Sequence, residues 1–401
     1  MSDAATRRDR DLGLGTRAVH PPSITEQPGA PMAPVLDPSS TYWFTDADEF
    51  ADASRDKTGA GYVYSRWANP TVDAFEAAVA DLEGTEGAEA FASGMAAITS
   101  ICLASCKSGD RIVAARQLYG GSHELLASIL PRYGITAELF DVHDFDGIEA
   151  VLAGAKLLLC ETIGNPRIEV ADLPTLANLA QNAGVPLVVD NTFASPALCR
   201  PVELGATLSV HSATKFIGGH HDLLGGIACG DFEALRPVAE LNREFGATLS
   251  PFNAWLALRG LVTLPLRVER ACASALLVAE YLSGHARIDR VYYPGLDDDP
   301  SKPLADKLLG GQGGGTLGFD VAGGREAAAR FQEALRLTRP AASLGGVHSL
   351  IVHAASITHT QLNADQLASI GIAEGFCRMS VGLEEPHDII DDLRNALDET
   401  A

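Results

Sequence analysis

The feature that most constrains the fold of this chain is a pair of apolar runs that each lead to a chemically reactive side chain. Residues 186–189 are apolar and end at the carboxylate of Asp190, and residues 206–210 form a second run that leads to Lys215. Continuous apolar runs joined by a crossover are typical of central strands in a parallel sheet, and α/β folds bind ligands at the carboxyl ends of such strands. We therefore expect Asp190 and Lys215 to face one crevice.

The residues around this expected crevice indicate the kind of ligand that it would hold. An acid and an amine share it, and the hydroxyls of Ser212 and Thr214 lie beside the amine in the sequence. This set suits a cofactor that carries an aldehyde, a basic ring nitrogen and a phosphate. Pyridoxal phosphate (PLP) has all three groups, so we expect PLP as the cofactor.

Two helix starts can be predicted from local sequence. Asn69 as N-cap and Pro70 at the first helical position predict a helix that stops at Gly84. A short strand at residues 89–92 leads to Ser93, where small residues open a second helix. Backbone N–H groups at such a turn attract an anion, and the helix N-terminus adds roughly half a positive charge.

Several motifs of this chain resemble those of one enzyme family when they are taken together and in order. Residues 61–71 read GYVYSRWANPT, residues 161–166 read ETIGNP, residues 211–215 read HSATK and residues 376–384 read FCRMSVGLE. This set resembles the Cys/Met-metabolism PLP enzymes. They comprise the cystathionine γ-synthases, γ-lyases and β-lyases, the methionine γ-lyases and the homoserine-ester sulfhydrylases. The resemblance covers nearly the whole chain, from about residue 14 to residue 397.

The resemblance implies the α/β fold of PLP-dependent transferases of fold type I, which is aspartate-aminotransferase-like. It has a mostly parallel central sheet and a smaller α/β C-terminal domain. We place an N-terminal arm for subunit contact at residues 1–58, which show little periodicity, a PLP-binding domain at residues 59–255 and the C-terminal domain at residues 256–401. From residue 226 to about residue 284 the chain is expected to be rich in helices. The second boundary is expected at a bend beside a long helix.

The resemblance also implies a role for each cofactor-binding residue. Lys215 would bind the aldehyde, Asp190 would keep the pyridine nitrogen protonated, and Tyr119 would stack on the ring. Asn165 would lie next to the 3-hydroxyl, and Thr192 is a further expected cofactor contact. The phosphate would be shared by Ser93, Gly94, Met95, Ser212 and Thr214, together with Tyr64 and Arg66 of a neighbouring subunit.

Substrate contacts follow from the same resemblance. Arg378 would hold the α-carboxylate of an amino acid with its guanidinium fork. Lys215, once displaced by the substrate, would take the α-proton, and Tyr119 would act as acid toward a γ-leaving group. Ser343, Asn165 and His348 are the other expected substrate-binding residues.

These roles imply γ-elimination or γ-replacement on a homoserine-derived sulfur amino acid or its ester, and we favour the cystathionine γ-synthase/γ-lyase type (transsulfuration). Methionine γ-lyase and O-acetyl- or O-succinylhomoserine sulfhydrylase stay open. Methionine γ-lyases typically carry Cys at the position of Gly121, and the cystathionine enzymes carry an acid at the position of His348. Residues 357–362 resemble the sulfhydrylases as much as the lyases.

Three patterns from other classes fit less well. Residues 212–215 form an S-x-x-K string and residues 57–59 a K-T-G string, as in serine acyl-enzymes, but the order is reversed and no S-D-N accompanies them. A GxGxxG pattern at residues 313–318 precedes an expected strand, whereas a dinucleotide site needs a helix there. A non-catalytic scaffold would not be expected to retain Lys215 and Asp190 together with Tyr119 and Arg378.

Composition narrows the partners. The chain has 30 Lys and Arg against 52 Asp and Glu, a net charge of −22, which argues against nucleic acids and anionic membranes. Its 7 cysteines show no metal-ligand spacing, so we expect reduced, buried thiols and no metal. Without an apolar signal core or an apolar run of about 18 residues, the chain is expected to be cytoplasmic. By the resemblance, it would be a homo-oligomer with a dimer as active unit, and usually a tetramer.

Overall fold

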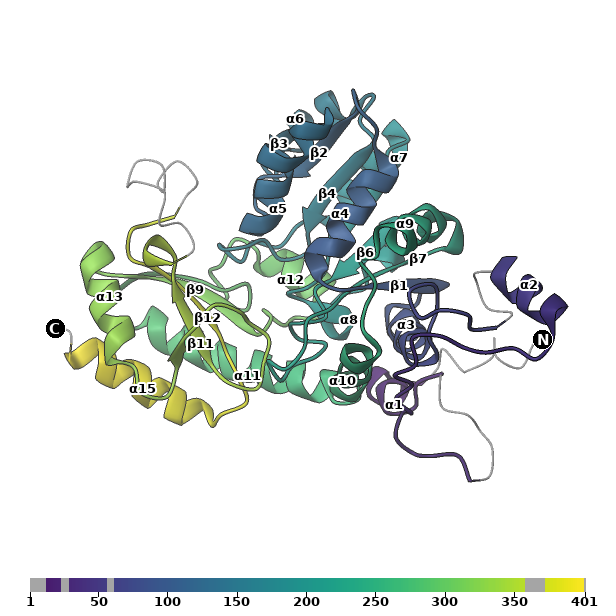
Figure 1. Ribbon diagram of the computed structural model, residues 1–401. Helices are drawn as coiled ribbons and strands as arrows, with labels where there is room; N and C mark the ends of the chain where they lie inside the picture. Colours follow the sequence, from purple (N-terminus) through teal and green to yellow (C-terminus); the bar gives the residue numbers. More distant parts are fainter. Residues whose placement is uncertain (1–11, 23–28, 56–60, 358–371, 400–401) are drawn as a thin grey trace.

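Two β-sheets organise the computed structural model, which describes residues 12–22, 29–55, 61–357 and 372–399 (Figure 1). The larger sheet has the strand order β1-β7-β6-β5-β4-β2-β3, and the smaller sheet has the order β10-β11-β12-β9-β8. The strands of the larger sheet are β1 Gly87–Phe91, β2 Arg111–Ala115, β3 Thr136–Phe140, β4 Leu157–Glu161, β5 Leu187–Asp190, β6 Leu208–His211 and β7 Gly226–Gly230. Those of the smaller sheet are β8 Ile288–Tyr292, β9 Thr316–Val321, β10 Arg339–Pro340, β11 Leu350–His353 and β12 Phe376–Ser380.

The larger sheet is mostly parallel, as predicted from its apolar runs. Strands β3, β2, β4, β5 and β6 pair in parallel, and β7 runs antiparallel to both of its neighbours. The register pairs Glu161 with Asp190 and Asp190 with Val210. The carboxyl ends of β4, β5 and β6 therefore meet at one edge of the sheet.

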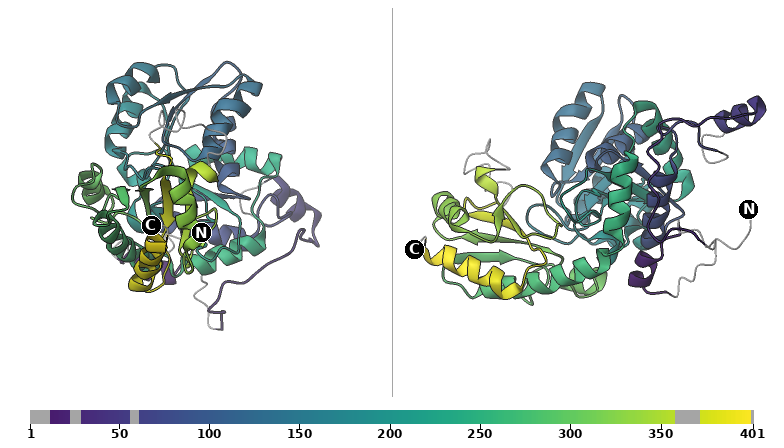
Figure 2. Two further views of the ribbon diagram at one scale, coloured as in Figure 1. Left: turned by 90° about the vertical axis from the view of Figure 1, so that its left-hand side faces the viewer. Right: turned by 60° about the horizontal axis from the view of Figure 1, so that its bottom comes forward.

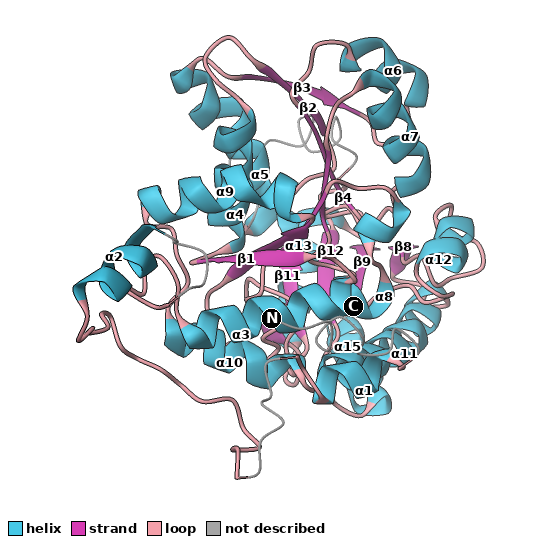
Figure 3. Cartoon of the chain, turned by 90° about the vertical axis from the view of Figure 1, so that its right-hand side faces the viewer, coloured by secondary structure: helices cyan, strands magenta, loops and turns pink. Residues whose placement is uncertain are grey.

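Helices cover both faces of the larger sheet. Figure 3 shows α4 and α9 on one side of β1, and α3 and α10 on the other. The helices of this part are α1 Leu14–Val19, α2 Ala47–Arg55, α3 Pro70–Glu83, α4 Gly94–Ser105, α5 Gly120–Glu124, α6 Phe145–Leu152, α7 Leu173–Ala183, α8 Ser195–Leu198, α9 Phe232–Phe245 and α10 Pro251–Leu261. They are followed by α11 Leu264–Ser283, α12 Lys302–Leu308, α13 Gly324–Ala334 and α15 Pro386–Glu399. Short π and 3-10 turns lie at Leu125–Ile129, Leu130–Tyr133, Pro201–Leu204 and Ala354–Ser356.

Both predicted helix starts are confirmed. The Asn69 side chain accepts hydrogen bonds from the backbone N–H of Thr71 at 2.9 Å and of Val72 at 3.4 Å, and Gly84 ends α3 with a φ of 74°. At the start of α4 the Ser93 hydroxyl accepts from Ala96 N–H at 3.1 Å. Each cap satisfies backbone donors that the first helical turn leaves without a partner.

Helix α11 connects two apolar cores. Its first half contributes Val268 and Cys272 to the core of the larger sheet, whereas its second half contributes Ala275 and Leu282 to the core of the smaller sheet. The right-hand view of Figure 2 shows the smaller sheet, with α15 outside it, beside the larger part of the molecule. The domain division at residue 256, which falls inside α10, stays a prediction.

Three details differ from the expectations. The chain is not helical directly after Gly226, because residues 226–230 form β7, a short buried strand with glycine at each end and only one β-branched residue, Ile227. Residues 14–19 and 47–55 of the expected irregular arm are helical. Residues 1–11, 23–28, 56–60, 358–371 and 400–401 lie outside the described residues, and with them the whole K-T-G string and most of the sulfhydrylase-like run.

Candidate active site

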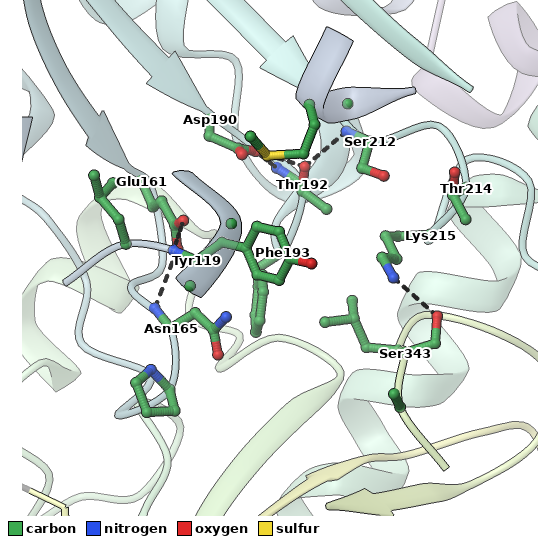
Figure 4. A pocket seen from close by; sticks show the side chains of 18 of the residues that line it. Tyr119, Glu161, Asn165, Asp190, Thr192, Phe193, Ser212, Thr214, Lys215 and Ser343 are labelled. Atoms are coloured by element: carbon green, nitrogen blue, oxygen red, sulfur yellow. Dashed lines mark hydrogen bonds between the residues drawn. The ribbon is translucent and has the colours of Figure 1, made fainter. Parts of the chain in front are cut away.

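A cavity of about 500 Å³ lies at the carboxyl edge of the larger sheet, where the two parts of the molecule meet. Asp190 and Lys215 both line it, as predicted from the sequence (Figure 4). The larger part supplies the ends of β4, β5 and β6 and the start of α4, and the smaller part supplies residues 342–344 and β12. Its lining includes Ser93, Gly94, Met95, Tyr119, Gly121, Glu161, Asn165, Asp190, Thr192, Phe193, Ser212, Thr214, Lys215, Leu224, Ser343 and Arg378.

Asp190, the last residue of β5, is fixed in orientation by Thr192. Its Oδ1 accepts from the backbone N–H of Thr192 at 3.0 Å and from the Thr192 hydroxyl at 2.5 Å. The same hydroxyl oxygen accepts from Ser212 N–H at 2.8 Å, so Thr192 also ties the end of β5 to the residue that follows β6. Burial raises the pKa of Asp190, while these bonds and the nearby His211 act in the opposite direction.

Lys215 directs its amine toward the smaller part of the molecule. Its Nζ donates to the Ser343 hydroxyl at 2.9 Å, and Figure 4 shows this contact. Burial lowers the pKa of Lys215, and the positive charge of Arg378 lowers it further. A larger fraction of this amine is therefore uncharged at neutral pH than for a lysine in water.

The start of α4 packs closely against Ser212. A Cβ added to Gly94 would lie 2.8 Å from Ser212 Cβ, so a larger residue would not fit there. The hydroxyl of Thr214, on the same turn, is held by the backbone of Gly225 at 3.0 Å and 3.3 Å. Ser93, Gly94 and Met95 at the start of the 12-residue α4 line the cavity together with Ser212 and Thr214, and a helix N-terminus at this position favours a phosphate.

Glu161 joins two loops that line the cavity. Its Oε1 accepts from Tyr119 N–H at 2.6 Å and its Oε2 accepts from Asn165 N–H at 3.1 Å. Burial raises the pKa of Glu161, the neighbouring Asp190 raises it further, and Arg378 acts in the opposite direction. Glu161 was not among the predicted site residues, although an acid at the end of the buried β4 is the same sequence signal that identified Asp190.

Arg378 reaches the cavity from the middle of β12. Its Nη1 donates to Asn165 Oδ1 at 2.9 Å and its Nη2 to the backbone carbonyl of Ser343 at 3.3 Å. Its guanidinium carbon lies 6.0 Å from the ring centroid of Phe193, another lining residue that the sequence did not single out. Burial lowers the pKa of Arg378 to about 10, opposed by the charge of Glu161, so the side chain stays cationic at neutral pH.

Comparison with known proteins identifies the family. Residues 15–398 match the model of the Cys/Met metabolism PLP-dependent enzymes. This chain belongs to that family. An L-methionine gamma-lyase of Porphyromonas gingivalis is 38% identical over 96% of this chain and 97% of its own length, and a cystathionine gamma-lyase of Bacillus subtilis is 38% identical over 84% and 89%. The fold matches that of a putative O-acetylhomoserine (thiol)-lyase from Campylobacter jejuni with a TM-score of 0.91 at 30% identity, covering 96% of this chain and 100% of that one.

Membership in the family confirms the predicted fold type I and the dependence on PLP, and the Campylobacter jejuni structure contains N'-pyridoxyl-lysine-5'-monophosphate. The residues of this PLP enzyme fit the cofactor. The start of α4 at Ser93, Gly94 and Met95 lines the cavity and suits a phosphate. The lowered pKa of the Lys215 amine suits reaction with an aldehyde. Among the described hydrogen bonds of the Asp190 side chain, both involve Oδ1, so Oδ2 is the oxygen that can contact the ring nitrogen.

Three residues expected in the site of this PLP enzyme do not line its cavity. Arg66 donates to the backbone carbonyl of Arg243, and its guanidinium lies 5.7 Å from the ring centroid of the exposed Tyr64. His348 stacks on His221 with 5.8 Å between ring centroids. The roles of Tyr64 and Arg66 in a neighbouring subunit, and of His348 toward the substrate, stay predictions.

The lowered pKa of Lys215 predicts selective chemistry in the cofactor-free protein. Because burial disfavours the ammonium form, modification of Lys215 by an amine-specific acylating reagent should persist to lower pH than modification of the exposed Lys107. Peptide mass spectrometry at a series of pH values gives the midpoint for each lysine, and added PLP should protect Lys215 alone. Coincident midpoints for the two lysines would contradict the lowered pKa.

Proposed function

We propose that this enzyme catalyses γ-elimination or γ-replacement on a homoserine-derived sulfur amino acid or its ester, in the manner of a cystathionine γ-synthase or γ-lyase. One observation carries the proposal. The Ser343 hydroxyl accepts a hydrogen bond from Lys215 Nζ, and the Ser343 carbonyl accepts one from Arg378 Nη2. A cation that can bind a carboxylate and an amine that can take a proton therefore both contact this one residue. If the carboxylate of an amino acid replaced the Asn165 and Ser343 oxygens that Arg378 now contacts, the α-carbon of that amino acid would lie on the side of Lys215.

In this proposal each residue moves or holds a proton at a defined atom. PLP, when bound, supplies the electron sink that stabilises negative charge on the substrate carbon. Lys215 Nζ takes the α-proton, for which its lowered pKa makes it a competent base. Asp190 holds the proton on the ring nitrogen, and the turn of Gly94, Met95 and Ser212 holds the phosphate.

Tyr119 is proposed as the acid for the γ-leaving group. The carboxylate of Glu161 holds the backbone N–H of Tyr119. The Tyr119 side chain is 51% exposed in the single chain and lines the cavity. The ring lies over Gly121, where an added Cβ would come 2.6 Å from Tyr119 Cε1. A side chain at position 121 would therefore move the ring. This supports a site that surrounds the γ-substituent of the substrate differently from enzymes with Cys at position 121. Methionine γ-lyase and acylhomoserine sulfhydrylase remain the alternative activities.

We further infer a cytoplasmic homo-oligomer with a dimer as active unit and a tetramer as the full assembly. Tyr64 and Arg66 lie outside the cavity of their own chain, which supports a role in a neighbouring one. Leu224 lines the cavity yet is 62% exposed in the single chain, so the cavity opens onto a face that a second subunit would cover. None of the described helices is long and apolar enough to cross a membrane. A fully active monomer would contradict the dimer.

The first test combines a visible spectrum with product analysis. Purified protein should be yellow, and the colour should be lost in Lys215→Ala. Cystathionine, methionine and the O-acetyl and O-succinyl esters of homoserine are then supplied with and without cysteine, and oxo acid, ammonia and thioether are measured. We expect turnover of cystathionine, or thioether formation from an ester with cysteine. Turnover of methionine alone would favour the methionine γ-lyase alternative over the proposal. If none of these substrates is turned over, the proposal is refuted.

Substitution of Arg378 tests the carboxylate site. Arg378→Ala should raise KM by about 10- to 100-fold, because a charged hydrogen bond contributes roughly 1.5 to 3 kcal/mol. Arg378→Lys keeps the positive charge but not the two parallel donors of the guanidinium, so its KM should lie between those of the wild type and Arg378→Ala. Steady-state kinetics measures both, with cofactor absorbance as the control for loading. An unchanged KM in Arg378→Ala would exclude this carboxylate site.

His348 tests specificity at the far end of the substrate. The family's acid at this position contacts the distal part of the substrate, so His348→Glu should shift kcat/KM toward cystathionine, which carries a distal amine, and away from the acylated homoserines. His348→Gln, which is neutral and of similar length, is the matched control. If the ratios of kcat/KM among cystathionine, methionine and the esters are the same in all three proteins, His348 has no role in specificity.

A further inference from the structure

A buried arginine from α11 lies directly behind the turn that carries Lys215. Arg267 is only 7% exposed, and its guanidinium points back toward the helix start. Nη1 donates to the carbonyl of Phe216 at 2.7 Å, and Nη2 donates to the carbonyl of Ile217 at 3.2 Å. These are the two residues that follow Lys215, so the arginine holds the chain immediately beyond the amine-bearing residue.

The same guanidinium reaches the junction between α10 and α11. Nη2 also donates to the carbonyl of Gly260 at 2.7 Å, and Nε donates to the Thr263 hydroxyl at 3.1 Å. All four acceptors are uncharged oxygens. Burial lowers the pKa of Arg267 to about 10, which shows the energetic cost of placing a cation here. Its position in the first turns of α11, the positive end of the helix dipole, adds to that cost.

The carbonyls that Arg267 binds need a partner. The chain from Ser212 to Gly219 forms a tight turn, in which Lys215 N–H donates to Ser212 O at 3.1 Å and Gly219 N–H donates to Lys215 O at 2.8 Å. The carbonyls of residues 216 and 217 point out of the end of this turn. Buried carbonyls without a donor are costly, and an arginine at the end of a helical turn can satisfy them.

Glycines allow the surrounding segments to approach this turn closely. Gly219 has a φ of 73°, and a Cβ there would lie 2.1 Å from Arg267 Nη1. A Cβ on Gly260 would lie 2.4 Å from the carbonyl oxygen of Gly218, and one on Gly345 would lie 2.7 Å from Phe216 N. The position of the turn is thus determined on several sides by backbone contact, and Arg267 supplies the hydrogen bonds on one of them.

We propose that Arg267 is a positioning residue for Lys215: its guanidinium fork fixes the carbonyl end of the lysine turn and thereby places Nζ in the cavity. Arg267 does not line the cavity and acts only through the backbone. The inference rests on the proposed role of Lys215 as the cofactor lysine, but not on the proposed substrate.

The test compares Arg267→Met and Arg267→Lys with Arg270→Met. Arg270 lies on the same helix and pairs with Glu385 at 3.1 Å on a more exposed face. Each protein is assayed for kcat and KM, for the dissociation constant of PLP from titration of the cofactor-free form, for the pH midpoint of Lys215 acylation and for the unfolding temperature. A displacement of about 1 Å costs about 100-fold in rate, so kcat should fall by about that factor in both Arg267 variants.

The expected pattern separates positioning from simple stability. Below the unfolding temperature, both Arg267 variants should lose kcat, bind PLP more weakly and shift the Lys215 midpoint, with KM changed less than kcat. Arg267→Lys should be nearly as impaired as Arg267→Met, because an ammonium cannot reach several carbonyls at once. A further variant, Arg267→Ala, leaves space for the missing group, and added guanidinium ion, but not urea, should restore part of its kcat and PLP affinity.

Two results would overturn the proposal. One is a lowered unfolding temperature with wild-type kcat, PLP affinity and Lys215 midpoint in the Arg267 variants. The other is equal losses in Arg270→Met. If the Arg267 variants do not fold, Thr263→Val removes one of the four acceptors and should give a smaller loss in the same direction, whereas no loss would also overturn the proposal. Covalent attachment of PLP to Lys215→Ala on borohydride reduction would refute the proposed role of the lysine. Inactivity of a PLP-loaded wild type would refute only the proposed substrate.

Discussion

The structure depends on the parallel register of three strands. Because β4, β5 and β6 run in the same direction and in register, Glu161, Asp190 and the segment after His211 reach one edge of the sheet together. A fully buried strand interior holds that register, since a slip of one residue would exchange the two faces of the strand. The acid at the end of β5 and the lysine after β6 line one cavity for this reason, although they are 25 positions apart in the sequence.

The smaller sheet completes a site that the larger sheet only begins. Ser343, in the left-handed region with a φ of 125°, and Arg378 on β12 both bond to groups of the larger part. Helix α11 carries residues of both cores, and Arg267 near its start bonds to the lysine turn. The relative placement of the two parts therefore bears on the chemistry as directly as the fold of each part does.

Local signals in the sequence predicted the elements that depend on local rules. The ends of β5, the cap at Asn69 and the start of α4 all follow from apolar runs, capping residues and small residues at a turn. Strand β7 was missed because a five-residue strand with a glycine at each end has little β-propensity, and only its burial between β1 and β6 stabilises it. The contacts of Ser343 and Arg267 join residues 128 and 51 positions apart, and no local pattern indicates them. His348 was placed by a motif alone. Its ring stacks on that of His221, and its role toward the substrate stays a prediction.

The guanidinium of Arg378 is already occupied by the chain's own oxygens. Asn165 and the Ser343 carbonyl, both neutral, are its acceptors, and in the proposed role of Arg378 a substrate carboxylate would take their place. Binding is therefore an exchange of acceptors, and its free energy is the difference between a charged and an uncharged oxygen. An amide or ester in place of the carboxylate would exchange one neutral acceptor for another and gain little. With Arg378 in its proposed role, uncharged analogues of the amino acid would be rejected without any steric barrier, because the site would offer them nothing better than the contacts that it already has.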